Sequence, residues 1–141
     1  MEKVLFICGG NTGRSQMAEA YLKELGGDSF EVKSAGLNPG VSVNPLVVEV
    51  MKEEGIDLSS NHPKAAFDFV KSGELFAYVI TVCDKETDDN CPIFPGIRKR
   101  ENWPFPDPEA ASGSHEEKLS QIREIRDRLK EKIIKFFDLT S

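Results

Sequence analysis

Residues 3–15 read KVLFICGGNTGRS, an apolar run that stops at Gly9-Gly10 and is followed by a glycine-rich loop. A short, continuously apolar run bounded by glycines is typical of a strand buried on both faces of a sheet. In open α/β sheets, ligands bind beyond the carboxyl ends of such strands, where the next helix points its first N–H groups outward. This stretch therefore predicts both an α/β fold and the position of its ligand site.

Strand and helix patterns alternate along the rest of the chain. Apolar side chains recur every four residues at Met17, Tyr21 and Leu25, which predicts a helix that ends at Gly26-Gly27. The other expected elements are a strand over 30–35, a helix that begins at the Asn44-Pro45 cap and ends at Gly55, a strand over 78–83, an edge strand around 98–100, and a final helix opened by the capping box 114–117. This alternation predicts a single open parallel sheet of about four strands with helices on both faces.

Length and charge narrow the classes of function. The 141 residues are expected to form one domain spanning 1–141. Lys and Arg number 18 against 24 Asp and Glu, which gives a net charge of −6 and argues against nucleic acid or an anionic membrane as partner. No segment approaches the roughly 20 apolar residues of a bilayer span, and the first residues lack the layout of a secretory signal. We therefore expect a cytoplasmic protein.

The glycine-rich loop has the composition of an oxyanion site. Glycines let the backbone curl closely around a small anion, and the Arg14 guanidinium matches the planar geometry of an oxyanion edge. Ser15 places a hydroxyl near the thiol of Cys8. The residues expected to contact the anion are Gly9, Gly10, Asn11, Thr12, Gly13, Arg14 and Ser15.

Cys8 is the candidate nucleophile of this loop. A free thiol has a pKa of ~8.5, and a helix N-terminus together with a nearby Arg lowers such a pKa into the range ~3.5–7.5. Two other interpretations compete: Cys8 as a small buried residue that ends a strand, and the loop as a nucleotide-binding P-loop. In the second case Cys8 stands in place of the first glycine and Arg14 in place of the lysine that reaches the terminal phosphates, so the nucleotide mechanism is disabled.

Several motifs resemble one family in the correct order. The loop with its C-x5-R-S spacing and the distant Asp107-Pro108 are similar to the low-molecular-weight protein tyrosine phosphatases and, more closely, to the thioredoxin-coupled arsenate reductases that share their fold. The matching segments are CGGNTGRSQMAEA at 8–20, SAG at 34–36, SNH at 60–62, the segment with Cys83, Cys91 and Pro92, and WPFPDP at 103–108. The resemblance spans nearly the whole chain and implies a low-molecular-weight tyrosine phosphatase-like fold.

The resemblance also implies a chemical role for all three cysteines. Cys83 ends a predicted strand and is expected at the same sheet edge as Cys8, while the polar residues 84–90 form a loop that carries Cys91. In the implied reaction, Cys8 attacks arsenate, Asp107 protonates the leaving oxygen, Cys83 forms a disulfide with Cys8, and Cys91 then takes over Cys83. Thioredoxin or a similar dithiol reduces the final disulfide.

Three further points follow from the comparison with that family. Asn11, Glu19 and Ser34 match positions that border a potassium ion in some reductases, but Pro63-Lys64-Ala65-Ala66 stands where an acidic partner is expected, so a cation is left open. Asn11 is expected to hold the loop through side-chain hydrogen bonds. No metal-ligand spacing is present, because neither His62 nor His115 has a second ligand at a suitable distance along the chain.

Two alternative functions remain open from the sequence. The first is a phosphatase that hydrolyses phosphotyrosine or a small phosphoester through a Cys8 phosphoenzyme; the same loop binds either tetrahedral anion. Glu109 weighs against it, because the tyrosine phosphatases carry an aromatic side chain at this position. The second is a sensor of oxyanions or redox state, for which the proton donor expected at Asp107 has no use.

Overall fold

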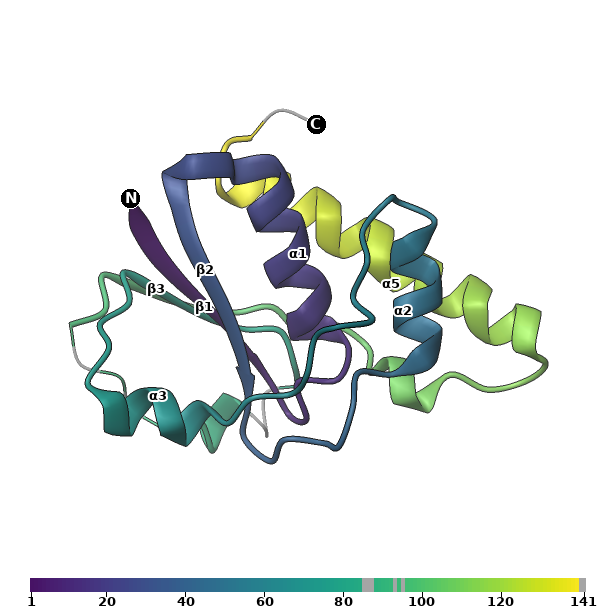
Figure 1. Ribbon diagram of the computed structural model, residues 1–141, viewed down its shortest axis with the longest axis horizontal. Coiled ribbons are helices and arrows are strands. Elements are labelled where there is room, and N and C mark those ends of the chain that lie inside the picture. Colours follow the sequence, from purple (N-terminus) through teal and green to yellow (C-terminus); the bar gives the residue numbers. More distant parts are fainter. Residues whose placement is uncertain (85–87, 93, 95, 140–141) are drawn as a thin grey trace.

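Four parallel strands form the sheet of this protein in a computed structural model that describes residues 1–84, 88–92, 94 and 96–139 (Figure 1). The strands are β1 (Glu2–Cys8), β2 (Phe30–Gly36), β3 (Tyr78–Thr81) and β4 (Lys99–Asn102). Their order in the sheet is β2-β1-β3-β4, and every neighbouring pair is parallel. The prediction of an open parallel sheet is confirmed, with β4 as the expected edge strand.

Helices cover both faces of the sheet. The α-helices described are α1 (Arg14–Gly26), α2 (Pro45–Lys52), α3 (Ala66–Ser72) and α5 (His115–Phe136), with short 3-10 helices η1 (Gly27–Ser29) and η2 (Pro108–Ala110). Figure 1 shows α1 and α5 on one side of the sheet and α3 on the other. Side chains of β1 alternate accordingly: Phe6 and Cys8 pack into the cluster with α1 and α5, whereas Leu5 packs into the cluster with α3.

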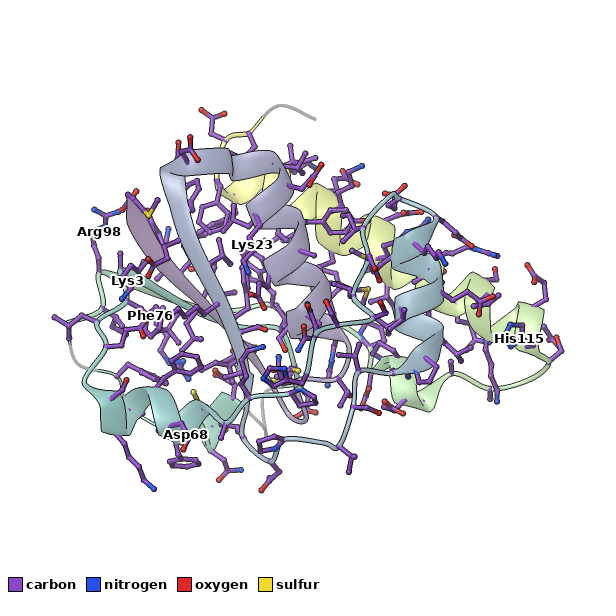
Figure 2. All side chains as sticks on the ribbon, in the orientation of Figure 1. Lys3, Lys23, Asp68, Phe76, Arg98 and His115 are labelled. Carbon is purple, nitrogen blue, oxygen red and sulfur yellow. The ribbon has the colours of Figure 1, made fainter. Side chains whose placement is uncertain are left out.

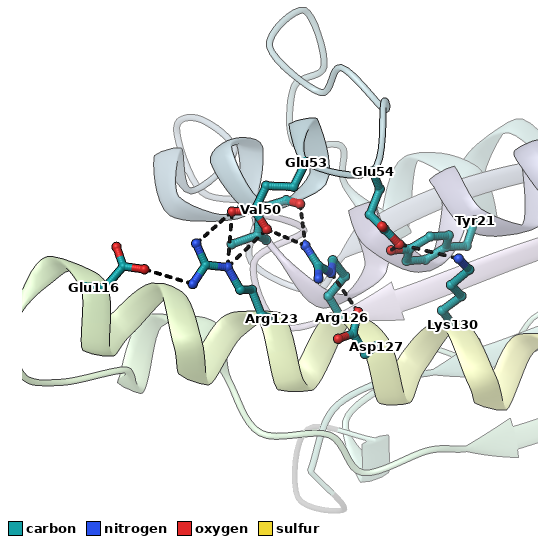
Figure 3. A network of polar contacts seen from close by, with 9 residues as sticks. All are labelled: Tyr21, Val50, Glu53, Glu54, Glu116, Arg123, Arg126, Asp127 and Lys130. Atoms are coloured by element: carbon teal, nitrogen blue, oxygen red, sulfur yellow. Dashed lines mark hydrogen bonds and ion pairs between the residues drawn. The ribbon is translucent and has the colours of Figure 1, made fainter.

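Helix α5 is fixed to α2 by charged side chains as well as by its apolar stripe. Ser114 and Glu117 form the predicted capping box at its start. Farther along, Arg126 is 8% exposed and donates to the Val50 carbonyl oxygen at 2.7 Å and to Glu53 at 2.8 Å (Figure 3). Arg123 adds a two-pronged contact to the same Glu53 carboxylate. None of the helices in the described ranges has both the length and the apolar character needed to cross a bilayer.

Two elements differ from the sequence prediction. Strand β3 ends at Thr81 rather than at residue 83, because the side-chain amide of Asn102 donates to the Cys83 carbonyl oxygen at 3.0 Å in place of a strand partner. Helix α3 was not predicted: it has seven residues and no side-chain cap, and only the left-handed Gly73 at its end (φ 73°) marks it in the sequence. Its last turn closes the face of the sheet opposite α1.

Candidate active site

Cys8 lies at the carboxyl end of the central strand β1, directly before the glycine-rich loop. It is 2% exposed, and its Sγ lies 2.9 Å from the Ser15 hydroxyl oxygen. The backbone N–H of Asn11 donates to the same sulfur at 3.2 Å. An N–H and a hydroxyl group that donate to sulfur are able to stabilise negative charge on it.

Asn11 holds the loop together, as expected from the sequence. It is fully buried and adopts the left-handed conformation (φ 56°), which Asn tolerates better than most residues. Its side-chain Nδ2 donates to Ser15 at 2.6 Å, and its Oδ1 accepts from the backbone N–H of Lys64 at 2.9 Å and from Gln16 Nε2 at 3.1 Å. Asn11 therefore connects the thiol's neighbour Ser15 to the segment before α3.

The chain after β2 braces the loop from outside. Leu37, Asn38 and Gly40 donate their backbone N–H groups to the carbonyl oxygens of Cys8, Gly9 and Gly10 at 3.1, 2.9 and 2.9 Å, respectively. Gly36 makes this close approach sterically feasible, because a Cβ there would lie 2.8 Å from the Asn11 nitrogen. The carbonyl oxygens of Cys8, Gly9 and Gly10 are therefore paired with the 37–40 segment, which fixes the path of the loop.

Arg14 and Asp107 meet at one side of the loop. Arg14 is 7% exposed and donates to the Phe105 carbonyl oxygen at 2.9 Å, and its guanidinium lies 3.7 Å from the Asp107 carboxylate. Asp107 has an exposed side chain and also caps η2 by accepting from the Glu109 N–H at 2.9 Å. The proline-rich segment thus carries an exposed carboxyl group to the edge of the loop.

These residues line one cleft of about 390 Å³. Its walls are formed by Cys8, Gly9, Gly10, Thr12, Gly13, Arg14, Gly40, Asp84, Asp107 and Glu109. Asn11 and Ser15 are fully buried and are not among the residues that line the cleft, and their contact with an anion stays a prediction. The cleft combines a thiol, a guanidinium and backbone N–H groups, a set suited to a small oxyanion, with carboxylates at its rim.

Cys83 lies beside this site, two residues after the end of the neighbouring strand β3. The Val82 N–H donates to the Ile7 carbonyl oxygen at 2.8 Å, so the segments that lead to Cys8 and Cys83 are still hydrogen-bonded one residue before each cysteine. Cys83 is 1% exposed and packs in the same apolar cluster as Cys8. Burial raises its pKa to about 12, partly offset by Arg14, so Cys83 is a neutral thiol at physiological pH.

Cys91 lies apart from the other two cysteines. It is partly buried against the apolar cluster on the α3 side of the sheet, whereas Cys8 and Cys83 belong to the cluster on the α1 side. Burial raises its pKa to about 11. Asp88 anchors this segment, because its carboxylate accepts from Thr81 and from Arg100 at 2.7 Å each. All three cysteines are free thiols.

Several residues of the site were not predicted as such. Gln16 is fully buried and joins Asn11 to the His62 carbonyl oxygen, at 3.1 and 3.2 Å. Glu109 accepts a hydrogen bond from Thr12 at 3.3 Å across the cleft. The sequence offers one signal for Gln16: it is a polar residue in the first turn of α1, among residues that are buried. Nothing local in the sequence indicates that Asp84 or the backbone of 37–40 reaches the cleft.

Comparison with known proteins agrees with this architecture. The model of the family described as low molecular weight phosphotyrosine protein phosphatase matches residues 3–140. Arsenate reductase 1 of Staphylococcus saprophyticus is 42% identical over 135 residues, which cover 94% of each chain. A solved arsenate reductase in the phosphate binding state has a TM-score of 0.77 and 30% identity over 98% of each chain. The thioredoxin-dependent arsenate reductase of Corynebacterium glutamicum has a TM-score of 0.64 and 34% identity, over 94% of this chain and 62% of that one.

The site and the comparisons point the same way. The thiol, the curled loop and the Arg14–Asp107 pair occupy the end of β1, and the matched range includes all of them. The chain belongs to the low molecular weight phosphotyrosine protein phosphatase family, within which it is similar to arsenate reductases.

Proposed function

We propose that this protein is a cytoplasmic arsenate reductase that works by a relay of three thiols and is regenerated by thioredoxin or a similar dithiol. One observation carries the proposal: a second buried thiol, Cys83, lies next to the nucleophile Cys8 at the same edge of the sheet. The relatives named arsenate reductases, one of them thioredoxin-dependent and one solved in a phosphate binding state, support it.

The first step is attack on a bound arsenate. The Cys8 thiolate forms a bond to arsenic, and one hydroxyl oxygen of the arsenate leaves as water after it receives a proton. Asp107 supplies that proton from the rim of the cleft, where its carboxyl group is exposed. The Arg14 guanidinium and the loop N–H groups stabilise the negative charge on the other oxygens.

The second step reduces arsenic. Cys83 loses its proton and attacks the Cys8 sulfur, the sulfur–arsenic bond breaks, and its electron pair stays with arsenic. Arsenic is thereby reduced from As(V) to As(III) and, after protonation, leaves as arsenous acid, while the two sulfurs are oxidised to one disulfide. Because burial holds the pKa of Cys83 near 12, deprotonation of this thiol is the energetically demanding part of the step.

The third step moves the oxidation away from the cleft. Cys91 loses its proton and attacks Cys83, and Cys8 is released as a thiolate, so a Cys83–Cys91 disulfide results. An external dithiol then supplies two electrons and two protons and restores both thiols. Since bonded cysteines have Cα atoms only ~5.5 Å apart, the segment carrying Cys91 must leave its position on the α3 side.

A phosphatase is the second candidate. The cleft accepts phosphate as readily as arsenate in shape and charge, and the family described for the chain is named for phosphotyrosine. Hydrolysis of a phosphoester needs the Cys8 thiol alone of the three cysteines, so Cys83 and Cys91 would have no role in it.

The test compares arsenite production by three proteins in the presence of thioredoxin, thioredoxin reductase and NADPH. We expect the unmodified protein to turn over repeatedly, Cys83→Ser to release no arsenite, and Cys91→Ser to release at most one arsenite per molecule. Binding of inorganic phosphate by calorimetry is the folding control for each variant. If both variants reduce arsenate repeatedly while p-nitrophenyl phosphate is hydrolysed rapidly, the relay is wrong and the phosphatase is supported.

A further inference from the structure

Glu19 is a buried carboxylate that sits behind the anion loop. It belongs to α1 and is 7% exposed. One of its oxygens accepts from the Ser34 hydroxyl of β2 at 2.5 Å, and the other accepts from the Lys23 ammonium at 2.6 Å. Figure 2 shows Lys23 between the ribbons of α1 and β2. A buried negative charge at this place opposes anion binding unless a positive charge neutralises it.

The residues around Glu19 do not fit a resident potassium ion. The Asn11 Oδ1, an amide oxygen at one of the three positions matched to a potassium site, already accepts two N–H groups, from Gln16 and from the backbone of Lys64. Glu19 faces the ammonium groups of Lys23 and Lys64.

Lys64 connects the buried carboxylate with the loop. Its Nζ lies 4.0 Å from a Glu19 oxygen and donates to the His62 carbonyl oxygen at 3.2 Å. Its backbone N–H donates to Asn11, and its carbonyl oxygen accepts from the Gly36 N–H at 2.8 Å. The side chain is 31% exposed and lines a cavity of about 390 Å³ together with Glu19, Lys23 and Lys33.

We propose that Lys64 is a positioning residue whose ammonium supplies, from within the chain, the positive charge at Glu19, so that oxyanion binding does not depend on a bound alkali cation. The path to the reactive sulfur is short. The backbone N–H of Lys64 donates to Asn11, Asn11 donates to Ser15, and Ser15 lies 2.9 Å from the Cys8 sulfur, so the ammonium extends from a segment that is joined to the thiol; its own influence on the loop is through its charge. The inference uses the oxyanion cleft of the proposed function but no redox step.

Removal of the ammonium has two consequences. Among the residues that the structure describes, the ion pair then left to Glu19 is the one with Lys23, whose ammonium lies 2.6 Å away but whose side chain is 57% exposed and therefore partly screened by water. The space left by the side chain lies beside a buried carboxylate, and a small free cation is attracted there. A variant without Lys64 is therefore expected to gain the dependence on cations that the unmodified protein lacks.

The test is calorimetric titration of the reduced protein with inorganic phosphate as its choline salt, at constant ionic strength in choline chloride or potassium chloride. We expect the unmodified protein to give the same affinity in both salts. Lys64→Ala should bind phosphate about tenfold more weakly in choline chloride, roughly the effect of one nearby charge in a partly solvated site. Potassium or ammonium ions should restore most of that affinity. Lys64→Met, which keeps the length but not the charge, should be weakened without being rescued, because its side chain still fills the space.

Lys33→Ala is the matched control, because Lys33 lines the same cavity but pairs with Glu74 at 3.0 Å. It should bind phosphate like the unmodified protein in either salt. Three results would overturn the proposal: a potassium-dependent affinity of the unmodified protein, an unchanged affinity of Lys64→Ala in choline chloride, or a loss that neither potassium nor ammonium restores. None of these depends on arsenite formation, so failure of the thiol relay is recognised separately by the Cys83→Ser variant.

Discussion

Two buried thiols of one apolar cluster, Cys8 and Cys83, have different surroundings. The Cys8 sulfur receives an N–H from Asn11 and lies beside the Ser15 hydroxyl, so donors face it. Cys83 is buried among apolar side chains, and this burial raises its pKa to about 12 even though Arg14 acts in the opposite direction. Polar groups thus face the Cys8 sulfur, whereas Cys83 is a protonated thiol at neutral pH; the proposed relay assigns these two thiols the roles of nucleophile and second thiol.

This difference gives a prediction for the reactivity of Cys83. In a Cys8→Ser/Cys91→Ser variant, alkylation of Cys83 by iodoacetamide should accelerate about tenfold per pH unit from pH 7 to 10 without levelling off, since only the thiolate reacts. At neutral pH it should be roughly a thousandfold slower than in the unfolded chain, because the pKa is shifted from 9.0 to about 12. The rate is measured by mass spectrometry with and without urea. Levelling off near pH 9 in the folded protein would contradict this assignment.

At the level of single residues, the sequence predicts the residues that carry the chemistry better than it predicts the buried contacts that hold them in place. The spacing of Cys8, the glycines and Arg14 is local, so it is visible in the sequence and identifies an oxyanion loop. Gln16 contacts Asn11 from 5 positions along the chain and Lys64 contacts it from 53 positions away, and no local sequence pattern indicates either contact. The same holds for the complete burial of Asn11 and Ser15, which no local pattern indicates.

Among the elements, the pair α2–α5 carries an unusual concentration of charge. Glu53, just after α2, accepts from Arg123 and Arg126 of α5, and Figure 3 shows both guanidinium groups converging on it. Hydrogen bonds from Arg123 and then Arg126 lower the pKa of Glu53 to about 2. The carboxylate therefore stabilises the folded chain as long as it is ionised in both the folded and the unfolded state.

Replacement of Glu53 should change the dependence of stability on pH. A lowered pKa contributes stability above about pH 4.5 that is lost as the pH falls towards 2, because the unfolded state takes up the proton first. Glu53→Gln should therefore be less stable than the unmodified protein at pH 7, and the difference should shrink between pH 4.5 and 2. Urea unfolding followed by circular dichroism measures both. The exposed Glu24→Gln is the control; an equal deficit for Glu53→Gln at pH 7 and pH 2.5 would refute the assignment.

The elements themselves were predicted where one pattern dominates. The strands 2–8 and 30–36 and the long helix 115–136 have strong apolar periodicity or a capping box, and they appear with bounds close to those expected. Helix α3 was missed because its seven residues allow less than two full turns of periodicity. The end of β3 was placed two residues too late, since a side chain of β4, Asn102, replaces the backbone partner there.

At the scale of the whole molecule, the sheet separates the cluster that holds Cys8 and Cys83 from the cluster against which Cys91 packs. Cys8 and Cys83 lie in the apolar cluster under α1 and α5, and Cys91 packs against the cluster on the α3 side. The proposed relay carries the oxidation around the carboxyl edge of the sheet. The thiol that faces arsenate then never has to meet the protein that reduces the final disulfide.

Disulfide mapping after a single dose of arsenate tests this account most directly. The reduced protein is mixed with one equivalent of arsenate and no reductant, then alkylated, digested and analysed by mass spectrometry. The relay predicts a loss of two hydrogens, one arsenite released per molecule, and a peptide cross-link between Cys83 and Cys91, with Cys8 alkylated as a free thiol. In Cys91→Ser the cross-link should join Cys8 and Cys83 instead. Release of arsenite with Cys83 and Cys91 both still alkylated as free thiols would contradict the relay.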